Sequence, residues 1–376
     1  MDIKCLFATA AKGIEEVLAG EIKEIGFKDV IVEKGGVRFG GDLSTCYRAN
    51  LWLRTAHRIL IPLAEFDCDT PQRLYDGIRS VNWNEYLSPD MTLAVDCNLR
   101  DSAMTHSGFA ALKTKDAIVD SIRDFCGRRP SVDARDPDLR INIRIFRNRC
   151  TVSLDSSGES LDKRGYRLDT GEAPLRETLA ATLVALSGWD GTVPLVDPMC
   201  GSGTICIEAS LKALRLPPGG MGKKYGFQRW PSFDHEVWKK LVKEAENRAL
   251  EKIPSPVLGF DISSGTVEKA RANADRAGVG KFVSFAVRDV AELAPPPSPG
   301  ILIFNPPYGV RLGEMEALKG LYRTIGDTLK QHCKGYTAYL FTGNPELAKS
   351  VGLKASRRMV LFNGPIECRL LKYNLY

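Results

Sequence analysis

The chain has 376 residues and a formal net charge of +6 at pH 7, with 44% hydrophobic and 26% charged residues. This length exceeds the usual range of a single core, so we expect two or three domains of ordinary globular composition. No N-terminal targeting signal and no apolar run of membrane-spanning length is visible, which predicts a cytoplasmic protein without a membrane partner. The mild positive charge permits a polyanionic partner but does not demand one.

Ten cysteines are scattered along the chain, and none of them forms a Cys-x-x-Cys pair. Most lie in apolar segments, which predicts buried free thiols in a reducing compartment. The four histidines show no ligand spacing. We therefore expect no metal ion.

Residues 1–66 read as a small α+β module. An alternating strand at 3–9 precedes an amphipathic helix at 13–25. Short strands at 30–33 and 37–39 flank a Gly35-Gly36 turn, a helix follows at 43–50, and a strand at 58–66 closes the unit. This order predicts a ferredoxin-like fold.

Residues 67–166 form a second expected unit. Helices are predicted at 71–79 and 107–126, a strand at 91–98, and a hairpin from 140–146 and 150–155. Arginines gather here, interleaved with aspartates, so the cluster fits either a solvated face or a phosphate-binding surface. The arginines are Arg123, Arg128, Arg129, Arg135, Arg140, Arg144, Arg147 and Arg149.

Residues 195–209 organise the third unit, 167–376, as a buried strand, a glycine turn and a helix that begins at Thr204. Such a unit places free helical N–H groups at the strand's carboxyl end, where open α/β sheets bind cofactors. The third small residue of a dinucleotide fingerprint is replaced by Cys206, and no Walker lysine follows. The acidic Asp197 before the glycines suits a cationic ligand.

Three more apolar strands follow, and polar residues come directly after each of them. The first ends at Asp261, where a carboxylate is able to accept ribose hydroxyls. The second precedes Asp289, and the third runs through 301–304 into Asn305-Pro306-Pro307-Tyr308. A single strand-terminal aspartate is usually a cap or a turn residue, but the ordered series predicts a binding edge.

The segment from Asn305 to Tyr308 has two interpretations. The two prolines alone suit a rigid turn. The same rigidity would aim the Asn305 side-chain oxygen and the Pro306 carbonyl at one planar amino group, with Tyr308 stacked on its ring. Chemistry at such an amino group would then depend on positioning and desolvation.

Two further segments leave their roles open. In the loop at 216–234, Lys223 and Lys224 suit RNA phosphates, whereas Phe227 and Trp230 suit either packing or base stacking. In the predicted helix at 175–186, Glu177 and Thr178 either contact a cofactor or cap the helix. The final strands are expected at 337–341, 353–361 and 366–373, the last two joined at Asn363-Gly364.

The run from Asp197 to Thr204 resembles motif I of class I S-adenosylmethionine (SAM) methyltransferases, and Asn-Pro-Pro-Tyr resembles the amino-methyltransferase signature. Residues 99–102, 113–120 and the exit Lys163-Arg164-Gly165-Tyr166-Arg167 resemble a THUMP RNA-binding domain. The whole chain is similar to THUMP-containing RNA methyltransferases, namely the bacterial stand-alone relatives of the N-terminal half of a fused large-subunit rRNA guanine-N2 methyltransferase. That resemblance implies an α/β class I (Rossmann-like) domain with a seven-stranded, mostly parallel sheet, preceded by ferredoxin-like and THUMP domains.

The resemblance also implies roles for individual residues. The target base is held by Asn305, Pro306, Pro307 and Tyr308. SAM, which leaves as S-adenosyl-L-homocysteine, is bound by Glu177, Thr178, Asp197, Met199, Cys200, Gly201, Gly203, Thr204, Asp261, Ile262, Asp289 and Val290. RNA is contacted by Arg144, Arg147, Arg149, Lys163, Arg164, Lys223 and Lys224.

The implied reaction is methylation of a guanine N2 in 23S rRNA or a large-subunit assembly intermediate, with no obligate protein partner. Transfer to tRNA guanine uses the same architecture, and DNA adenine-N6 methylation shares Asn-Pro-Pro-Tyr. A non-catalytic RNA-binding assembly factor is a further alternative, against which the intact Asp197, Asp261 and Asn305 argue.

Overall fold

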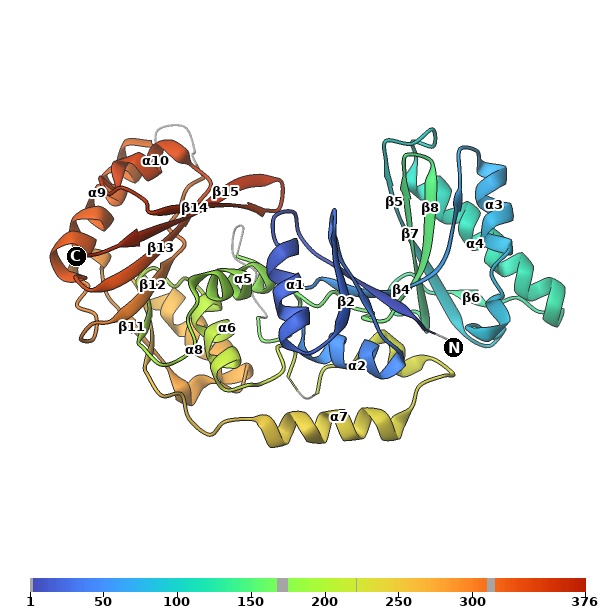
Figure 1. Cartoon of the computed structure of the whole chain (residues 1–376), viewed down its shortest axis with the longest axis horizontal. Coiled ribbons are helices and arrows are strands. Elements are labelled where there is room, and N and C mark those ends of the chain that lie inside the picture. The colour runs from blue at the N-terminus through green and yellow to red at the C-terminus, as the bar shows by residue number, and fades with distance from the viewer. Residues whose placement is uncertain (1–2, 168–174, 221, 310–314) are drawn as a thin grey trace. The chain divides into compact units, whose positions relative to one another are not determined.

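A computed structural model describes residues 3–167, 175–220, 222–309 and 315–376 (Figure 1). The chain forms two compact units. Unit 1 comprises residues 1–10, 19–161 and 224–241, and unit 2 comprises residues 11–18, 162–223 and 242–376. Among the described residues, no helix is long and apolar enough to span a bilayer.

Unit 1 contains the ferredoxin-like elements and then the THUMP-like elements. The first set is β1 (Cys5–Thr9), α1 (Glu15–Glu24), β2 (Lys28–Glu33), β3 (Gly36–Gly40), α2 (Leu43–Trp52) and β4 (Arg58–Asp67). The second set is α3 (Pro71–Arg79), η1 (Trp83–Glu85), β5 (Thr92–Arg100), α4 (Ser107–Cys126), β6 (Ser131–Val132), β7 (Leu139–Phe146) and β8 (Arg149–Asp155).

One sheet joins the two expected N-terminal modules. Within the described chain its order is β2-β3-β1-β4-β8-β7-β5-β6, and β4 pairs antiparallel with β8. Along β7 the side chains alternate between fully buried Ile141, Ile143 and Ile145 and half-buried polar residues. Because strand side chains alternate between faces, one face of the sheet forms a core and the other stays accessible.

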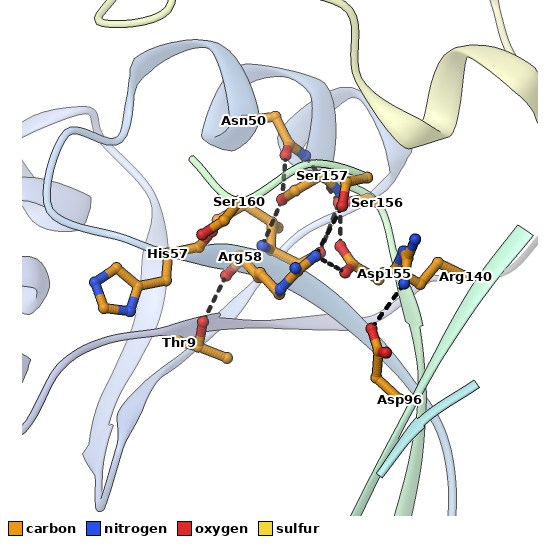
Figure 2. Close-up of polar contacts among 12 residues, drawn as sticks. Thr9, Asn50, His57, Arg58, Asp96, Arg140, Asp155, Ser156, Ser157 and Ser160 are labelled. Atoms are coloured by element: carbon orange, nitrogen blue, oxygen red, sulfur yellow. Dashed lines mark hydrogen bonds and ion pairs between the residues drawn. The ribbon is translucent and has the colours of Figure 1, made fainter. Parts of the chain in front are cut away.

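A buried polar network fixes β4 to the chain that leaves β8 (Figure 2). Arg58 forms an ion pair with Asp155, whose side chain is 1% exposed, and donates to the Gly158 carbonyl at 2.8 Å. Asn50 exchanges hydrogen bonds with Ser156 and Ser157 at 2.8 and 2.7 Å. Burial raises the pKa of Asp155 although Arg58 opposes the shift.

The segment from Lys224 to Leu241 lies in the sequence between two elements of unit 2 but belongs to unit 1. It contains η2 (Gly226–Arg229) and the start of α7 (His235–Arg248). Phe227 is fully buried and stacks on Tyr47 of α2 at 4.3 Å between ring centroids. Trp230 is also buried. The packing alternative therefore holds for both aromatic residues, and base stacking does not.

Unit 2 contains a second sheet. Its helices and strands are α5 (Glu177–Ser187), β9 (Leu195–Asp197), α6 (Thr204–Ala213), β10 (Val257–Asp261), α8 (Ser264–Arg276), η3 (Gly280–Phe282), β11 (Val283–Val287), η4 (Val290–Glu292), β12 (Gly300–Phe304), α9 (Met315–His332), β13 (Tyr336–Thr342), α10 (Pro345–Ser350), β14 (Arg357–Asn363) and β15 (Ile366–Asn374). Among the described residues, the seven strands run in the order β11-β10-β9-β12-β13-β15-β14, with β15 antiparallel to both neighbours. This sheet confirms the expected class I fold.

The final hairpin differs in its turn from the expectation. Asn363 pairs with Ile366, so the two turn residues are Gly364 and Pro365. Gly364 has φ +60°, the conformation that the first central position of a type II′ turn requires. Asn363 is consequently the last residue of β14, directly before the turn.

We predict that Phe227→Ala lowers the stability of unit 1 by about 3–5 kcal/mol, because it removes a fully buried ring that packs on Tyr47. Thermal and urea unfolding would measure the change. Phe125→Ala, at a ring that is 73% exposed, is the matched control and should change stability by less than about 0.5 kcal/mol. Equal effects of both substitutions would contradict the packing role.

Candidate active site and nucleic-acid surface

The sequence-predicted polar residues meet at one edge of the unit 2 sheet. Strand β9 pairs in parallel with β10 on one side and with β12 on the other. Asp197, Asp261 and Asn305 therefore stand at the carboxyl ends of three adjacent strands. The strand order reverses here, which is where open α/β sheets bind ligands.

The two glycines of the turn have different tasks. A Cβ on Gly203 would lie 2.8 Å from the Phe285 ring and 3.0 Å from Ala270, so Gly203 allows α6 to pack closely. A Cβ on Gly201 would meet no atom within 4 Å among the described residues. The φ angles of Gly201 and Gly203 are both positive, at 53° and 83°. Gly201 thus leaves backbone accessible to a ligand, and Gly203 serves packing.

Asp197 is a buried carboxylate, 2% exposed, that accepts one hydrogen bond from the Met199 N–H at 3.2 Å. Burial raises its pKa to about 8, and the neighbouring negative charge of Asp261 adds to the shift. A cation placed here would stabilise the ionised form. The residue therefore fits the positively charged end of SAM.

The glycine turn is held against β10. Asp261 accepts from the Gly201 N–H at 3.0 Å and from the Ser263 N–H at 3.0 Å. The Cys200 N–H donates to the Phe260 carbonyl at 2.7 Å. Burial raises the pKa of the Cys200 thiol, so this side chain acts as a small apolar group. Thr204, 5% exposed, begins α6 beside this turn.

The adjoining residues suit a nucleoside. Ile262, directly after Asp261, is 71% exposed, so its apolar side chain is accessible to a ligand. Asp289 accepts from the Ala291 N–H at 2.9 Å, and Val290 beside it is buried. These side chains offer carboxylate and apolar contacts together, as ribose and adenine binding requires.

Glu177 and Thr178 occupy the first turn of α5, where Arg176 is the N-cap residue. Glu177 forms an ion pair with Arg167 at 2.7 Å, and Thr178 is 1% exposed. Neither residue is the N-cap, so the capping alternative is not observed. A contact of these two residues with SAM stays a prediction.

The catalytic candidate Asn305 follows β12 at the same edge. Its side-chain oxygen is buried and has no hydrogen-bond partner among the described residues. A buried acceptor without a partner costs about 1–3 kcal/mol, which an incoming N–H donor would recover. Pro307 is exposed, Pro306 is buried, and Tyr308 is half-buried.

A basic groove crosses the accessible face of the unit 1 sheet, with a volume of about 810 Å³. Its lining comes from alternate residues of β4, β5, β7 and β8, such as Asn142 and Arg144, or Thr151 and Ser153. The charged lining residues in the described chain are Lys34, Arg38, Arg58, Arg100, Arg144, Arg149, Glu33 and Glu65. The excess of cations favours a polyanion.

The sequence-predicted RNA residues are distributed unevenly. Arg144 and Arg149 line the groove, and Arg147 is exposed in the turn between β7 and β8. Lys163 and Lys224 are exposed, whereas the Lys223 ammonium donates to the Lys163 carbonyl at 2.6 Å. Sequence reasoning did not connect Arg38 and Arg100 with this groove, because only the joined sheet brings them beside Arg144.

The expectation for Arg164 is wrong. Its side chain is 1% exposed and forms a buried ion pair with Glu208 at 3.4 Å, while Tyr166 donates to the same carboxylate at 3.1 Å. Losing this pairing to reach an RNA phosphate would leave a charge buried without its partner. Arg164 therefore serves the structure of unit 2.

The catalytic part of the chain matches a family model described as the RMKL-like methyltransferase domain over residues 164–372. The chain belongs to the RMKL-like methyltransferase family. Residues 5–60 match the RlmL ferredoxin-like domain, and residues 68–155 match the THUMP domain. This is the family of THUMP-domain, class I SAM-dependent RNA methyltransferases that the motifs resemble.

Curated relatives agree over nearly the whole chain. A protein of Synechocystis sp., provisionally named an RNA methyltransferase, is 43% identical over 370 residues, which are 98% of this chain and 96% of that protein. Ribosomal RNA large subunit methyltransferase K/L of Methylococcus capsulatus is 43% identical over 376 residues, covering 98% of this chain and 51% of that protein. The chain thus spans about half the length of that K/L relative.

Solved structures with the same fold extend over the full chain. SMU.472, provisionally described as a methyltransferase and solved in complex with SAH, has a TM-score of 0.91 at 32% identity and covers 100% of this chain and 99% of its own. A Listeria monocytogenes protein, described as a predicted N6-adenine-specific DNA methylase, has a TM-score of 0.91 at 33% identity, covering 100% and 97%.

The residues at the sheet edge fit SAM, the cofactor of this family. Asp197 supplies a buried carboxyl that a cation would hold ionised, Gly201 an accessible backbone, and Ile262 an exposed apolar side chain. When bound, SAM supplies an electrophilic methyl group on a sulfonium. Within the described residues, no group of three or more His, Cys, Asp or Glu side chains has the arrangement of a metal site.

We predict that Asp197→Asn stabilises the ligand-free protein but abolishes SAM binding. The pKa of Asp197 is raised in the folded state to about 8, so its stabilising contribution is present below the unfolded value and is lost as the pH rises through about 8. The melting temperature of the variant should therefore exceed that of the wild type more at pH 8 than at about pH 5.5. Calorimetry with SAM at both pH values tests the binding, which should strengthen towards pH 8 in the wild type. A pH-independent difference in melting temperature would contradict this assignment.

Proposed function

We propose that the chain transfers a methyl group from SAM to the exocyclic N2 of a guanine in 23S rRNA, in the cytoplasm. The observation that carries the proposal is the buried Asn305 oxygen without a partner among the described residues, which follows β12 beside the SAM-type glycine turn. The names of the K/L relatives support a large-subunit rRNA or an assembly intermediate as the substrate.

In this proposal the Asn-Pro-Pro-Tyr segment acts by positioning the target amino group and its base. The Asn305 oxygen and the Pro306 carbonyl each accept one N–H of the target amino group, and Tyr308 stacks on the base. Both N–H bonds then point at fixed acceptors, so the nitrogen lone pair is directed towards the methyl group. The base must leave any helical stack to reach this segment. The amine loses its proton after transfer, so no general base is required.

The basic groove of unit 1 is the proposed RNA-binding surface. Arginines suit this role because their planar guanidinium groups bind phosphate oxygens in pairs. Arg144 and Arg149 lie on neighbouring strands, and both are accessible at the groove. Lys163 of unit 2 and Lys224 of unit 1 are further proposed RNA contacts.

We predict that Asn305→Ala lowers methyl transfer by at least about a hundredfold while SAM affinity stays unchanged, because the acceptor is needed only for the target amine. Tritiated SAM would be offered with 23S rRNA transcript, large-subunit precursor particles, bulk tRNA and duplex DNA, and the products digested to nucleosides. Asn374→Leu, an exposed position at the opposite edge of the sheet, is the control.

The labelled product of that assay identifies the substrate, and the absence of label points to a different function. Label in N2-methylguanosine of 23S rRNA or particles supports the proposal, and label in tRNA keeps the chemistry but changes the substrate. Label in N6-methyladenine of DNA would agree with the description of the Listeria protein and reject RNA. SAM binding without label in any substrate would favour the non-catalytic assembly factor.

We predict that the double substitution Arg144→Gln, Arg149→Gln weakens RNA binding about tenfold and reduces the slope of log K against log salt by about 2. Filter binding over a salt series would measure both. Arg128→Gln, Arg129→Gln, at exposed positions outside the groove, is the charge-matched control. An equal loss in the two doubles would show that net charge, rather than the groove, binds the RNA.

A further inference from the structure

The hydroxyl group of Tyr308 is held by the last hairpin of the chain. The Asn363 side-chain N–H donates to this hydroxyl at 2.8 Å, and the Cys368 thiol lies 3.8 Å from the same oxygen. Asn363 and Cys368 are 55 and 60 residues from Tyr308 in sequence. Neither belongs to a methyltransferase motif that the sequence displays.

Sheet topology explains how Asn363 reaches the site. Strand β15 is antiparallel to β13, and β14 is antiparallel to β15, so β14 runs in the same direction as β13 and β12. The end of β14 therefore lies at the same edge as Asp197 and Asn305. The Gly364-Pro365 turn follows directly, and Asn363 is the last β14 residue before it.

The ring of Tyr308 is enclosed along its length as well as at its tip. Phe341 at the end of β13 meets it edge-on, with 6.3 Å between centroids. A Cβ on Gly343 would lie 2.9 Å from the Tyr308 ring and 3.0 Å from Ile366. The glycine thus allows the ring to lie against the backbone that follows β13. Burial raises the pKa of Tyr308 to about 12, so the hydroxyl stays protonated at neutral pH.

We propose that Asn363 is a positioning residue that, by holding the hydroxyl end, fixes where the Tyr308 ring lies, and that the target base stacks on this ring. The inference rests on the proposed function, because it presumes that a base stacks on Tyr308. A ring free to swing about its Cα–Cβ bond would sample positions that do not match the base held by Asn305. A hydrogen bond to the hydroxyl at the far end of the ring restricts this motion. The affinity for SAM does not depend on this bond, because SAM is bound by other residues.

The consequence for catalysis is specific. Loss of orientation should lower the rate of the chemical step and leave SAM affinity unchanged, since preorganised stacking acts on the reacting base alone. A general folding defect would instead weaken SAM binding as well. The distinction separates positioning from structural support.

We expect Asn363→Leu to lower kcat by about three- to tenfold with an unchanged KM for SAM. Tyr308→Phe keeps the ring but removes the acceptor, so it should give a similar loss. The double variant should lose no more than either single variant, because both remove one interaction. Asn363→Asp should restore part of the rate, since the tyrosine hydroxyl is able to donate to a carboxylate. Asn374→Leu, an exposed asparagine of β15 at the opposite edge, is the matched control.

A measurement independent of activity tests the contact itself. Tyrosine labelled with ¹³C at Cζ would report each hydroxyl environment by NMR, and the Tyr308 signal is assigned by its loss in Tyr308→Phe. It should shift in Asn363→Leu and stay in place in Asn374→Leu, while the other tyrosine signals confirm the fold. An unmoved signal would overturn the inference, as would additive losses in the double variant. An inactive wild type would overturn the proposed function, and the NMR shift would still decide whether Asn363 holds Tyr308.

Discussion

The buried carboxylate of Asp197 is the constraint on which the catalytic unit depends. This side chain is 2% exposed and accepts a single backbone hydrogen bond, so its ionised form is unfavourable and its pKa is raised to about 8. Packing around β9 maintains that state, with Leu195 and Val196 fully buried beside it. Energy stored in this way is available to a cationic ligand, because ionisation and binding then favour each other. The Asn305 oxygen, buried and without a partner among the described residues, would favour an N–H donor in the same way.

Asp197 and Asn305 lie at the ends of adjacent strands at one edge of the sheet. Asp197 belongs to the strand that begins the glycine turn, and Asn305 follows the adjacent strand on the other side. Gly203 allows α6 to approach the sheet, so that the turn can lie over the strand ends without a side chain in between. The antiparallel hairpin also supplies a residue to this edge. The carboxyl end of β14 lies there, which places Asn363 beside Tyr308.

In unit 1, a groove lies on the face of a continuous sheet rather than at the ends of its strands. Strands β4 and β8 join two modules into one continuous sheet, and the buried Arg58–Asp155 pair with its serine and asparagine partners fixes the junction (Figure 2). Only a continuous sheet lets alternate residues of several strands line one groove. The segment from Lys224 to Leu241 packs its aromatic rings into this unit, although the sequence on both sides of it belongs to unit 2.

The sequence by itself determined the chemistry-bearing motifs and many of the strands and helices around them. The glycine turn, the acids at strand ends and Asn305 to Tyr308 are local patterns, and a strand or helix period of two or 3.6 residues is also local. The expected ferredoxin-like, THUMP and class I folds were confirmed on this basis. Ser107–Cys126 and Pro71–Arg79 even have the predicted bounds.

Tertiary structure alone decided which side chains are accessible and which distant residues meet. Arg164 looks like its basic neighbours in sequence, yet Glu208 on α6 buries it. Sequence leaves both stacking and packing open for Phe227 and Trp230, with packing favoured, until Tyr47 is placed beside Phe227. Arg58 joins the groove, and Asn363 joins Tyr308, through strand pairings that close loops of many residues. Such pairings depend on the summed packing of the whole sheet, which no short stretch of sequence encodes.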